Sequence, residues 1–419
     1  MKAKLKIIQL ASICSNLGDN ANISGLRWLI RTSFPEVEVE FTDWDIVDYS
    51  WSRTYTEADI DFVNSHDLLI IGGGGFFEIL PNTPSWTGTR FNLPEALFDK
   101  IRIPIMFHGI GTHRVRADLA GVDLQPQIDR FGRFLERIRA DDRVLLSFRN
   151  DGSRHVLRRT FGDAVADSVT VVADAGLYAH IPDDNHRAQA RLPDGLTGAP
   201  LVAVNFGGDL LEARFPDGGT QYDLVAGNRW SHPVDYEKPR IVDHPGFMRF
   251  VEGFADVARG WLDRHPDMRL VFVPHIYRDL QMGAALLSEL GFPYNRRRVT
   301  MAPYLHGPDG HDYIFDFYRR CDCVIGMRFH ANVSPVGLGV PTIGLTTFPM
   351  LHGFYEEIGC LDRTVDPRNT NAMAVMDGLL SQTLRDNQNI RQRYATVRNQ
   401  CETVSRDFIS RIGGLIRGI

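Results

Sequence analysis

Two series of short apolar runs, each alternating with amphipathic helical patterns, constrain the fold of this 419-residue chain more than any other feature. The first series extends from Leu5 to Val172, and the second extends from Leu201 to Leu345. Runs that are apolar on both faces and separated by helices are typical of a parallel sheet that is covered on both sides. The sequence therefore predicts an α/β protein with two Rossmann-like domains.

The expected secondary structure follows from these two series. In the first series the expected strands are 5–10, 37–41, 68–71, 103–107, 144–147 and 169–172, and the expected helices are 20–31, 125–139 and 153–160. In the second series the expected strands are 201–205, 270–274, a short one at Val299, 323–325 and 342–345, and the expected helices are 247–264, 280–290, 313–320 and 331–338.

The polar segment 182–200, rich in Pro, Asp and Gly, reads as a linker between two domains. We therefore place an N-terminal domain at 1–185, a C-terminal domain at 195–370 and a helical tail at 371–419. The charged face of the tail is expected to be solvated, with contact to an anionic membrane surface as the alternative. That face includes Arg391, Arg393 and Arg398.

The long segment 207–244 interrupts the second series and is rich in Gly, Asp and Pro. Loops of this length are usually functional or mobile. Aromatic faces suit sugar rings, so the segment either shapes acceptor choice or is a packed surface excursion. Its aromatic residues, with one just before it, are Phe206, Phe215, Tyr222, Trp230 and Tyr236.

Composition excludes several classes of protein. With 43% hydrophobic and 23% charged residues the chain is an ordinary globular protein, and a net charge of −6 argues against nucleic acid as a partner. No apolar run reaches the roughly 18 residues of a membrane span, and the N-terminus lacks a signal peptide's apolar region. We expect a cytoplasmic protein, with the inner face of the membrane as an alternative location. The five dispersed cysteines suit a reducing compartment; they are Cys14, Cys321, Cys323, Cys360 and Cys401.

Candidate binding residues follow the strands, because open α/β sheets bind ligands at the carboxyl ends of their strands. Asn16, Gly18 and Asp19 follow the first strand. They suit either a capped strand-to-helix turn or contact with a ligand at the helix N-terminus.

Glycines and a histidine follow the next strands in the same way. Gly73 and Gly74 belong to a run of four glycines whose N–H groups could bind an anion, although no Walker lysine follows. His108 ends the fourth strand and is either a ligand contact or a packed strand-end histidine.

Arginines and histidines at later strand ends are the strongest candidates. Arg149 ends a strand of the first series, and its planar guanidinium suits carboxylate or phosphate. Arg328 and His330 follow a buried strand and open a helix, with Asn332 in its first turn. The helix N-terminus favours an anion there, and histidine suits proton transfer near neutral pH. His275, with Asp279, is a similar strand-end group of weaker specificity.

These pieces, in this order, resemble the polysaccharide pyruvyl transferase family over about residues 5–360. The most specific piece is the G-x-R-x-H-A element, Gly326 to Ala331, followed by Gly339-Val340-Pro341. The other matching pieces are Asn16-x-Gly18-Asp19, Gly72 to Gly75, Gly109 to Gly111, Ser147-Phe148-Arg149-Asn150, Val172 to Ala175, and Val273-Pro274-His275 with Asp279. One departure is Met350, because many members carry a lysine in that stretch.

The resemblance implies a GT-B-like fold, with two Rossmann-like domains facing across a cleft. It also implies transfer of the pyruvyl group of phosphoenolpyruvate to a sugar as a ketal, in exopolysaccharide or glycoconjugate biosynthesis. Arg149 and Arg328 would hold the donor's phosphate and carboxylate, and His330 would be the acid/base residue. The implied partners are phosphoenolpyruvate and a sugar acceptor: a lipid-linked oligosaccharide, a nucleotide sugar or a free glycan.

No cofactor is expected beyond the donor substrate, and no metal, because no cluster of carboxylates and histidines has metal-ligand spacing. One alternative function is a GT-B glycosyltransferase that uses a nucleotide sugar, with Glu356 or Glu357 placed to bind the ribose. A second alternative is a non-catalytic saccharide-binding protein of the same fold, since fold alone does not fix function.

Overall fold

The computed structural model describes residues 3–13, 16–46, 54–80, 83–114, 123–181, 199–215 and 241–416. Nearly all of the expected linker lies outside the described residues, as does the middle of the 207–244 segment. Three of the aromatic residues named for that segment therefore lie outside as well: Tyr222, Trp230 and Tyr236.

The first sheet is fully parallel and has the order β2-β1-β3-β4-β5-β6. Its strands are β1 (Ala3–Ala11), β2 (Val37–Asp45), β3 (Leu68–Gly72), β4 (Ile105–Ile110), β5 (Val144–Arg149) and β6 (Thr170–Val172). Between and after them lie α1 (Leu17–Ser33), α2 (Glu57–Val63), α3 (Glu95–Phe98), α5 (Gln125–Ala140), α6 (Ser153–Phe161), α7 (Asp163–Ser168) and the 3₁₀ turn η2 (Ala175–Tyr178).

The second sheet is also parallel, with the order β12-β11-β10-β7-β8-β9. Its strands are β7 (Leu201–Asn205), β8 (Arg269–Phe272), β9 (Val299–Met301), β10 (Cys323–Gly326), β11 (Thr342–Leu345) and β12 (Thr364–Val365). Its helices and 3₁₀ turns are α9 (Leu211–Arg214), η5 (Ile241–Asp243), α10 (Pro245–Arg264), α11 (Tyr277–Leu290), α12 (Tyr294–Arg297), α13 (Gly307–Arg319), α14 (His330–Gly337), α15 (Pro349–Glu357) and η6 (Leu361–Arg363).

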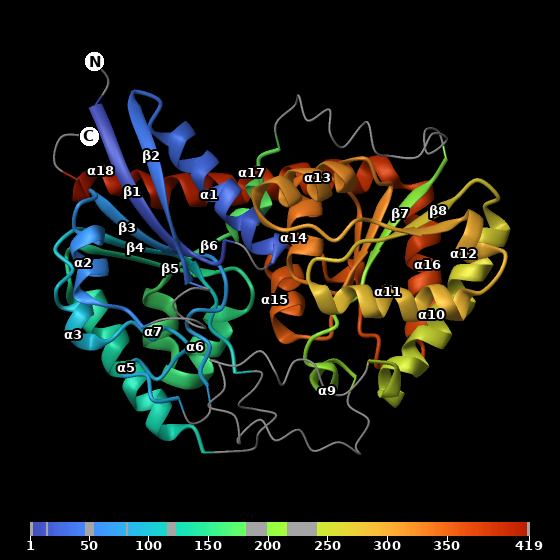
Figure 1. Cartoon of the computed structure of the whole chain (residues 1–419), viewed down its shortest axis with the longest axis horizontal. Helices are drawn as coiled ribbons and strands as arrows, with labels where there is room; N and C mark the ends of the chain where they lie inside the picture. The colour runs from blue at the N-terminus through green and yellow to red at the C-terminus, as the bar shows by residue number, and fades with distance from the viewer. Residues whose placement is uncertain are drawn as a thin grey trace.

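These sheets confirm the α/β fold class and the two Rossmann-like domains, which Figure 1 shows side by side. The chain order reverses between β1 and β3 in the first sheet and between β7 and β10 in the second. Such reversals leave a crevice at the carboxyl ends of the neighbouring strands, where α/β proteins bind ligands. Each sheet is covered on both faces by buried apolar side chains, which fix the positions of these strand ends.

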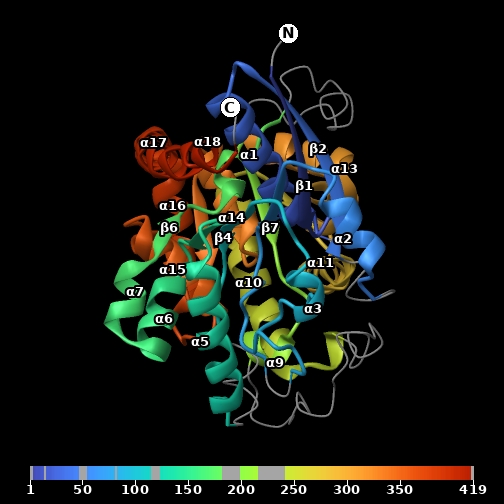
Figure 2. The ribbon, with the colours of Figure 1, turned by 90° about the vertical axis from the view of Figure 1, so that its left-hand side faces the viewer.

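The C-terminal segment contains α16 (Ala372–Arg385), α17 (Asn387–Ser410) and α18 (Ile412–Leu415). Helix α17 returns to the first domain, where Figure 1 shows it running along both domains. There the Tyr178 hydroxyl is 3.1 Å from Ser405 Oγ. Figure 2 shows α17 and α18 on one side of the first domain and α2 and α3 on the other.

The charged face of α17 is only partly solvated, because Arg393 is exposed whereas Arg391 and Arg398 are half-buried. Arg391 donates to the carbonyls of Gly339 and Cys321, at 3.1 and 3.0 Å. Arg393 pairs with Asp362 at 2.8 Å, and the Arg398 guanidinium lies 5.7 Å from the centre of the Trp28 ring. These arginines bind the protein itself, because the helix docks against both domains. In the described part of the chain, no helix is long and apolar enough to span a membrane.

Helix α15 forms a direct contact between the two domains. A Cβ atom on Gly353 would lie 2.6 Å from the backbone of Asp151, so the helix and the turn after β5 approach closely. Glu357, which was considered above as a ribose ligand, accepts a hydrogen bond from the Gly152 N–H at 3.0 Å. The carboxyl end of β5 is therefore held at the domain junction, together with Arg149.

Candidate active site

His330 belongs to the second domain, but its ring lies on the first. It begins α14 directly after the loop that leaves β10, and it is 6% exposed. A Cβ atom on Gly18, in the first turn of α1, would lie 2.5 Å from His330 Nδ1, and one on Gly176 would lie 2.9 Å from Cδ2. Both positions require a residue without a side chain, because the imidazole occupies that space.

Asp174, directly after β6, links His330 to Arg149. Its Oδ1 lies 3.2 Å from His330 Nε2, and its Oδ2 accepts from Arg149 Nη1 at 3.1 Å. Burial alone would raise the pKa of Asp174, but the charges of His330 and Arg149 outweigh burial and hold this pKa well below its usual range. Since the ionised carboxylate can only accept, Nε2 carries the proton and Nδ1 is left to face α1.

Arg149 is only 3% exposed, and its guanidinium donates to carboxylates of the protein, whereas the sequence predicted that it would face a ligand. Its Nε donates to Asp151 Oδ2 at 2.7 Å, in addition to the bond to Asp174. Its guanidinium lies 4.3 Å from the centre of the ring of Phe329, the residue between Arg328 and His330 in the sequence. The guanidinium N–H groups that were expected to bind the donor anion are thus largely occupied by carboxylates of the protein. Arg149 instead fixes Asp174 and, through it, His330.

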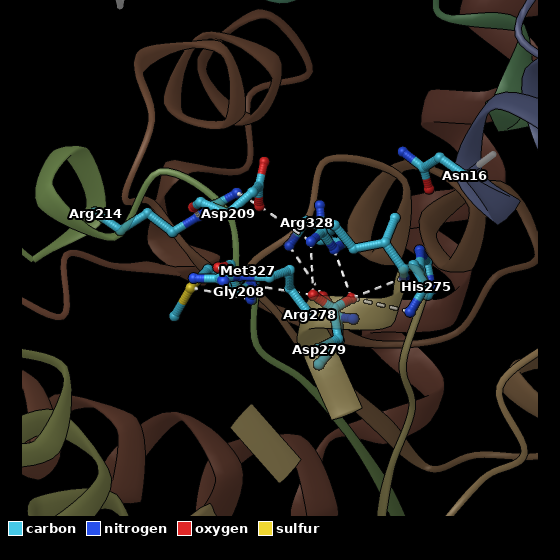
Figure 3. Close-up of polar contacts among 12 residues, drawn as sticks. Asn16, Gly208, Asp209, Arg214, His275, Arg278, Asp279, Met327 and Arg328 are labelled. Carbon is cyan, nitrogen blue, oxygen red and sulfur yellow. Dashed lines mark hydrogen bonds and ion pairs between the residues drawn. The ribbon is translucent and has the colours of Figure 1, made fainter. Parts of the chain in front are cut away.

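Arg328 is the centre of a second cluster, shown in Figure 3. Its Nε and Nη2 donate to the two oxygens of Asp279, each at 2.6 Å, which is a bidentate pair. Its Nη2 is also 3.0 Å from Asp209 Oδ1. Burial alone would lower the pKa of Arg328, but the two carboxylates raise it above its usual value, so the guanidinium stays charged.

His275 belongs to the second cluster. Its backbone N–H donates to Asp279 Oδ2 at 2.9 Å, and its ring Nε2 lies 2.8 Å from the Tyr318 hydroxyl. Burial, with the nearby charges of Arg328 and His330, lowers the pKa of His275 well below its usual value. The ring is therefore neutral at physiological pH, and it fits a hydrogen-bonding role better than a charged one.

Asn332 organises the loop that carries Arg328 and His330. Its Nδ2 donates to the carbonyls of Gly326 and Arg328, at 3.0 and 2.8 Å. Its Oδ1 accepts from the Tyr355 hydroxyl at 2.9 Å. Asn332 is fully buried, so it acts as a support for the loop rather than as a direct substrate contact.

The N-terminus of α1 contributes Asn16, its N-cap, and Asp19, in its first turn. Asn16 caps α1, with its Oδ1 accepting from the Gly18 N–H at 3.0 Å. Burial raises the pKa of Asp19, although the charges of His330, Arg90 and Arg149 oppose the effect. Asp19 is therefore a stronger base than an ordinary aspartate, and it lies within electrostatic range of His330.

The glycine run and His108 are the remaining candidates at the strand ends of the first sheet. Gly73 and Gly74 both have positive φ, and a Cβ atom on Gly73 would lie 2.4 Å from Asn22 Oδ1, whereas nothing lies within 4 Å of one on Gly74. The ring of His108 is fully buried, with its centre 6.0 Å from that of Phe408 in α17. Burial lowers the pKa of His108 to about 4, which places a neutral imidazole in the core.

Sequence reasoning did not select Asp209 or Arg214 as site residues, and it included Asp174 only within the Val172 to Ala175 piece of the resemblance. Asp174 lies two residues after β6 and Asp209 four residues after β7, so the strand-end rule that selected Arg149 could have found both. Arg214 lies in a one-turn helix inside the long insertion, and no pattern pointed to it. Within the described ranges, no three His, Cys, Asp or Glu side chains come together in a way that could hold a metal ion.

A family model described as polysaccharide pyruvyl transferase matches residues 16–347, which include both clusters. The chain belongs to the polysaccharide pyruvyl transferase family. It is thereby a transferase of polysaccharide biosynthesis, and the resemblance drawn from the strand-end motifs is confirmed. The residue that departs from the expected lysine, Met350, lies in the first turn of α15. No curated protein matches the chain in sequence.

Solved structures show the same fold. UDP-GlcNAc 2-epimerase from Neisseria meningitidis, bound to UDP-GlcNAc, superposes with a TM-score of 0.53 at 9% identity, covering 97% of this chain and 99% of that one. MnaA from S. aureus, in a structure with UDP, gives a TM-score of 0.50 at 10% identity, covering 98% and 96%. At such low identity the likeness establishes the fold alone, which is GT-B-like.

Proposed function

We propose that this transferase moves the pyruvyl group of phosphoenolpyruvate onto a sugar, where two hydroxyl groups close a ketal. The observation that carries the proposal is the chain of contacts from Arg149 through Asp174 to His330. Through these contacts two residues of the first domain orient the imidazole of the second domain. Family membership supports a pyruvyl transfer, and the proton chemistry of this reaction needs such a residue.

The reaction begins with protonation of the methylene carbon of phosphoenolpyruvate, which produces positive charge at C2. A sugar hydroxyl attacks C2 and loses its proton, and a second hydroxyl then attacks while the C2–O bond to phosphate breaks. One hydroxyl proton balances the proton placed on the methyl group, and the other leaves with inorganic phosphate. The products are therefore a cyclic ketal and phosphate, with no oxidation or reduction.

His330 is the residue we assign to the first proton transfer. Asp174 accepts from Nε2, so the working nitrogen is Nδ1, which lies against the N-terminus of α1. Arg149 is a positioning residue in this scheme, because it keeps Asp174 ionised rather than touching the donor itself. The pairing of a proton-transferring histidine with an orienting carboxylate is a general arrangement in acid–base catalysis.

Asp19 is the group we assign to the acceptor hydroxyl. Its raised pKa makes it a better base, and it lies in the first turn of α1, next to Gly18, which packs against His330. Asn16 and the exposed side of Gly74 border the same end of the first sheet, which is where we place the sugar. The donor then lies toward the second domain, near Arg328.

The direct test is phosphate release from phosphoenolpyruvate across a panel of sugar acceptors, with mass spectrometry of the products. We expect release only with acceptors that carry two suitably placed hydroxyl groups, and a product heavier by one pyruvyl unit. Thermal shift provides a second test, in which phosphoenolpyruvate stabilises the protein and UDP does not. Stabilisation by UDP without any phosphate release would favour a nucleotide-sugar glycosyltransferase instead.

A further inference from the structure

The loop after β7 adopts a conformation that its sequence does not favour. Leu210 has φ of 50°, in the left-handed region, where a leucine costs about 1–2 kcal/mol. Such conformations persist where surrounding contacts require them, and they concentrate at functional sites. Here the turn reverses the chain, so that Arg214 at the end of α9 returns to the strand end. A Cβ atom on Gly207 would lie 2.7 Å from the guanidinium carbon of Arg214.

Arg214 is held on every side. Its Nε donates to the Asp209 carbonyl at 2.9 Å, and its Nη1 donates to Thr347 Oγ1 at 2.8 Å. The guanidinium lies 4.0 Å from the centre of the Phe348 ring, in the loop before α15. With 2% of its surface exposed, Arg214 is among the most buried charged side chains of the second domain.

Two guanidiniums meet at one carboxylate oxygen. Asp209 Oδ1 lies 3.0 Å from Arg214 Nη2 and also 3.0 Å from Arg328 Nη2. Figure 3 shows Asp209 between the two arginines, at the crossover between β7 and β10. The Asp209 side chain is 22% exposed, against 3% for Arg214 and 9% for Arg328, so Asp209 is the most accessible of the three side chains. The arginines are thus preorganised around an oxyanion.

We propose that Arg214 is a donor-binding residue, and that it acts with Arg328 to hold the phosphate group of phosphoenolpyruvate at the site where both now contact Asp209. This inference rests on the proposed function. Phosphate offers more charge and more acceptor oxygens than a carboxylate, and guanidinium groups bind it in bidentate geometry. Asp209 competes with the donor for the same N–H groups.

Because Asp209 competes with the donor, removing its charge should strengthen donor binding instead of weakening it. An Asp209→Asn variant keeps an oxygen that can accept from both arginines but removes the negative charge. The KM for phosphoenolpyruvate should therefore fall, whereas a merely structural ion pair would leave this KM unchanged or raise it. Arg214→Met should raise this KM by about 10- to 100-fold, the range for a charged hydrogen bond, and Arg214→Lys should restore part of the loss.

The experiment compares wild type, Arg214→Met, Arg214→Lys, Asp209→Asn and a control, Arg298→Met. Arg298 is another partly buried arginine of the second domain, and it donates to the carbonyls of Met268 and His265. For each protein we would measure the donor KM, the acceptor KM, kcat, the inhibition constant of inorganic phosphate, and Tm. We expect the Arg214 variants to weaken phosphate inhibition and donor binding together, with the acceptor KM unchanged.

The outcomes separate the inference from the function on which it rests. A wild-type protein that releases no phosphate from phosphoenolpyruvate with any acceptor overturns the proposed function. A wild-type protein that turns over, while Arg214→Lys and Arg214→Met keep its donor KM, overturns the role of Arg214 alone. If Arg214→Met does not fold, a higher donor KM in Asp209→Asn overturns the competition, because that variant preserves the hydrogen-bonding shape of the loop.

Discussion

Asp174 Oδ1 and His330 Nε2 lie 3.2 Å apart, although 156 residues separate them in the chain and they belong to different domains. The contact sets the orientation of the imidazole only while the domains keep their present arrangement. Helix α17 packs against both domains, and α15 contacts the turn after β5, so the arrangement is supported at two further places. The position of the proposed proton donor thus depends on how the domains are joined.

Replacing the carboxylate that orients His330 should reduce turnover more than binding. In Asp174→Asn the side-chain oxygen can still accept, but the negative charge that stabilises the ring and pairs with Arg149 is lost. We expect kcat to fall by about 10- to 100-fold, with the donor KM within a few-fold of wild type. Steady-state kinetics would check this, with Asp163→Asn on the exposed Arg158 pair as the control. An unchanged kcat would remove Asp174 from the mechanism.

Gly18, which packs against the His330 ring, provides a steric test of the position of that ring. In Gly18→Ala the new methyl group would lie 2.5 Å from Nδ1, so the imidazole has to move. A displacement of about 1 Å can reduce a rate by about 100-fold, and we expect kcat to fall on that order while the fold is retained.

The matched control for Gly18→Ala is Gly378→Ala on α16, where a Cβ atom meets nothing within 4 Å. That variant should be stabilised by about 0.5–1 kcal/mol and keep its activity, because alanine favours a helix. Wild-type kinetics in Gly18→Ala would show that the ring has room that the structure does not give it.

The buried His108 should make stability depend on acid pH. Its pKa falls from 6.5 to about 4 on burial, so the unfolded chain takes up a proton before the folded one does. Stability should therefore be fully present above pH 6.5 and fall by about 2–3 kcal/mol as the pH drops toward about 4.5. In His108→Leu this part of the loss should disappear.

Chemical denaturation of wild type and His108→Leu across this pH range measures the difference. His155→Gln, at an exposed histidine of α6, is the control and should follow the wild-type curve. Parallel curves for wild type and His108→Leu would contradict a buried neutral imidazole.

Much of the fold could be predicted because apolar alternation records burial directly. The run at 68–71 became β3, which ends one residue later, at Gly72, and the helix expected at 125–139 became α5. The path of α17 could not be predicted, since its polar face reads as solvated until Arg391 and Arg393 are seen to bind carbonyls and a carboxylate of the protein. Long-range contacts of this kind leave no periodic signal.

The site was predictable to the extent that it lies at strand ends. Arg149, Arg328 and His330 were chosen on that rule; the structure joins Arg149 to His330 through Asp174, and it places Arg328 in the second cluster with Asp279 and Asp209. What the rule could not give was their partners. A strand-end arginine looks the same in sequence whether it faces a ligand or a carboxylate of its own chain. Only the fold shows that Arg149 faces carboxylates of its own chain.

Proton transfer to the methylene carbon of the donor is the central claim, and solvent deuterium tests it most directly. The reaction would be run with phosphoenolpyruvate and an active acceptor in D₂O, for wild type and His330→Ala, and the ketal methyl group would be examined by NMR and mass spectrometry. We expect one deuterium in each methyl group with wild type, and a kcat lower by at least about 10²–10⁴-fold in His330→Ala. A product whose methyl group carries no solvent deuterium, or full turnover by His330→Ala, would contradict the mechanism.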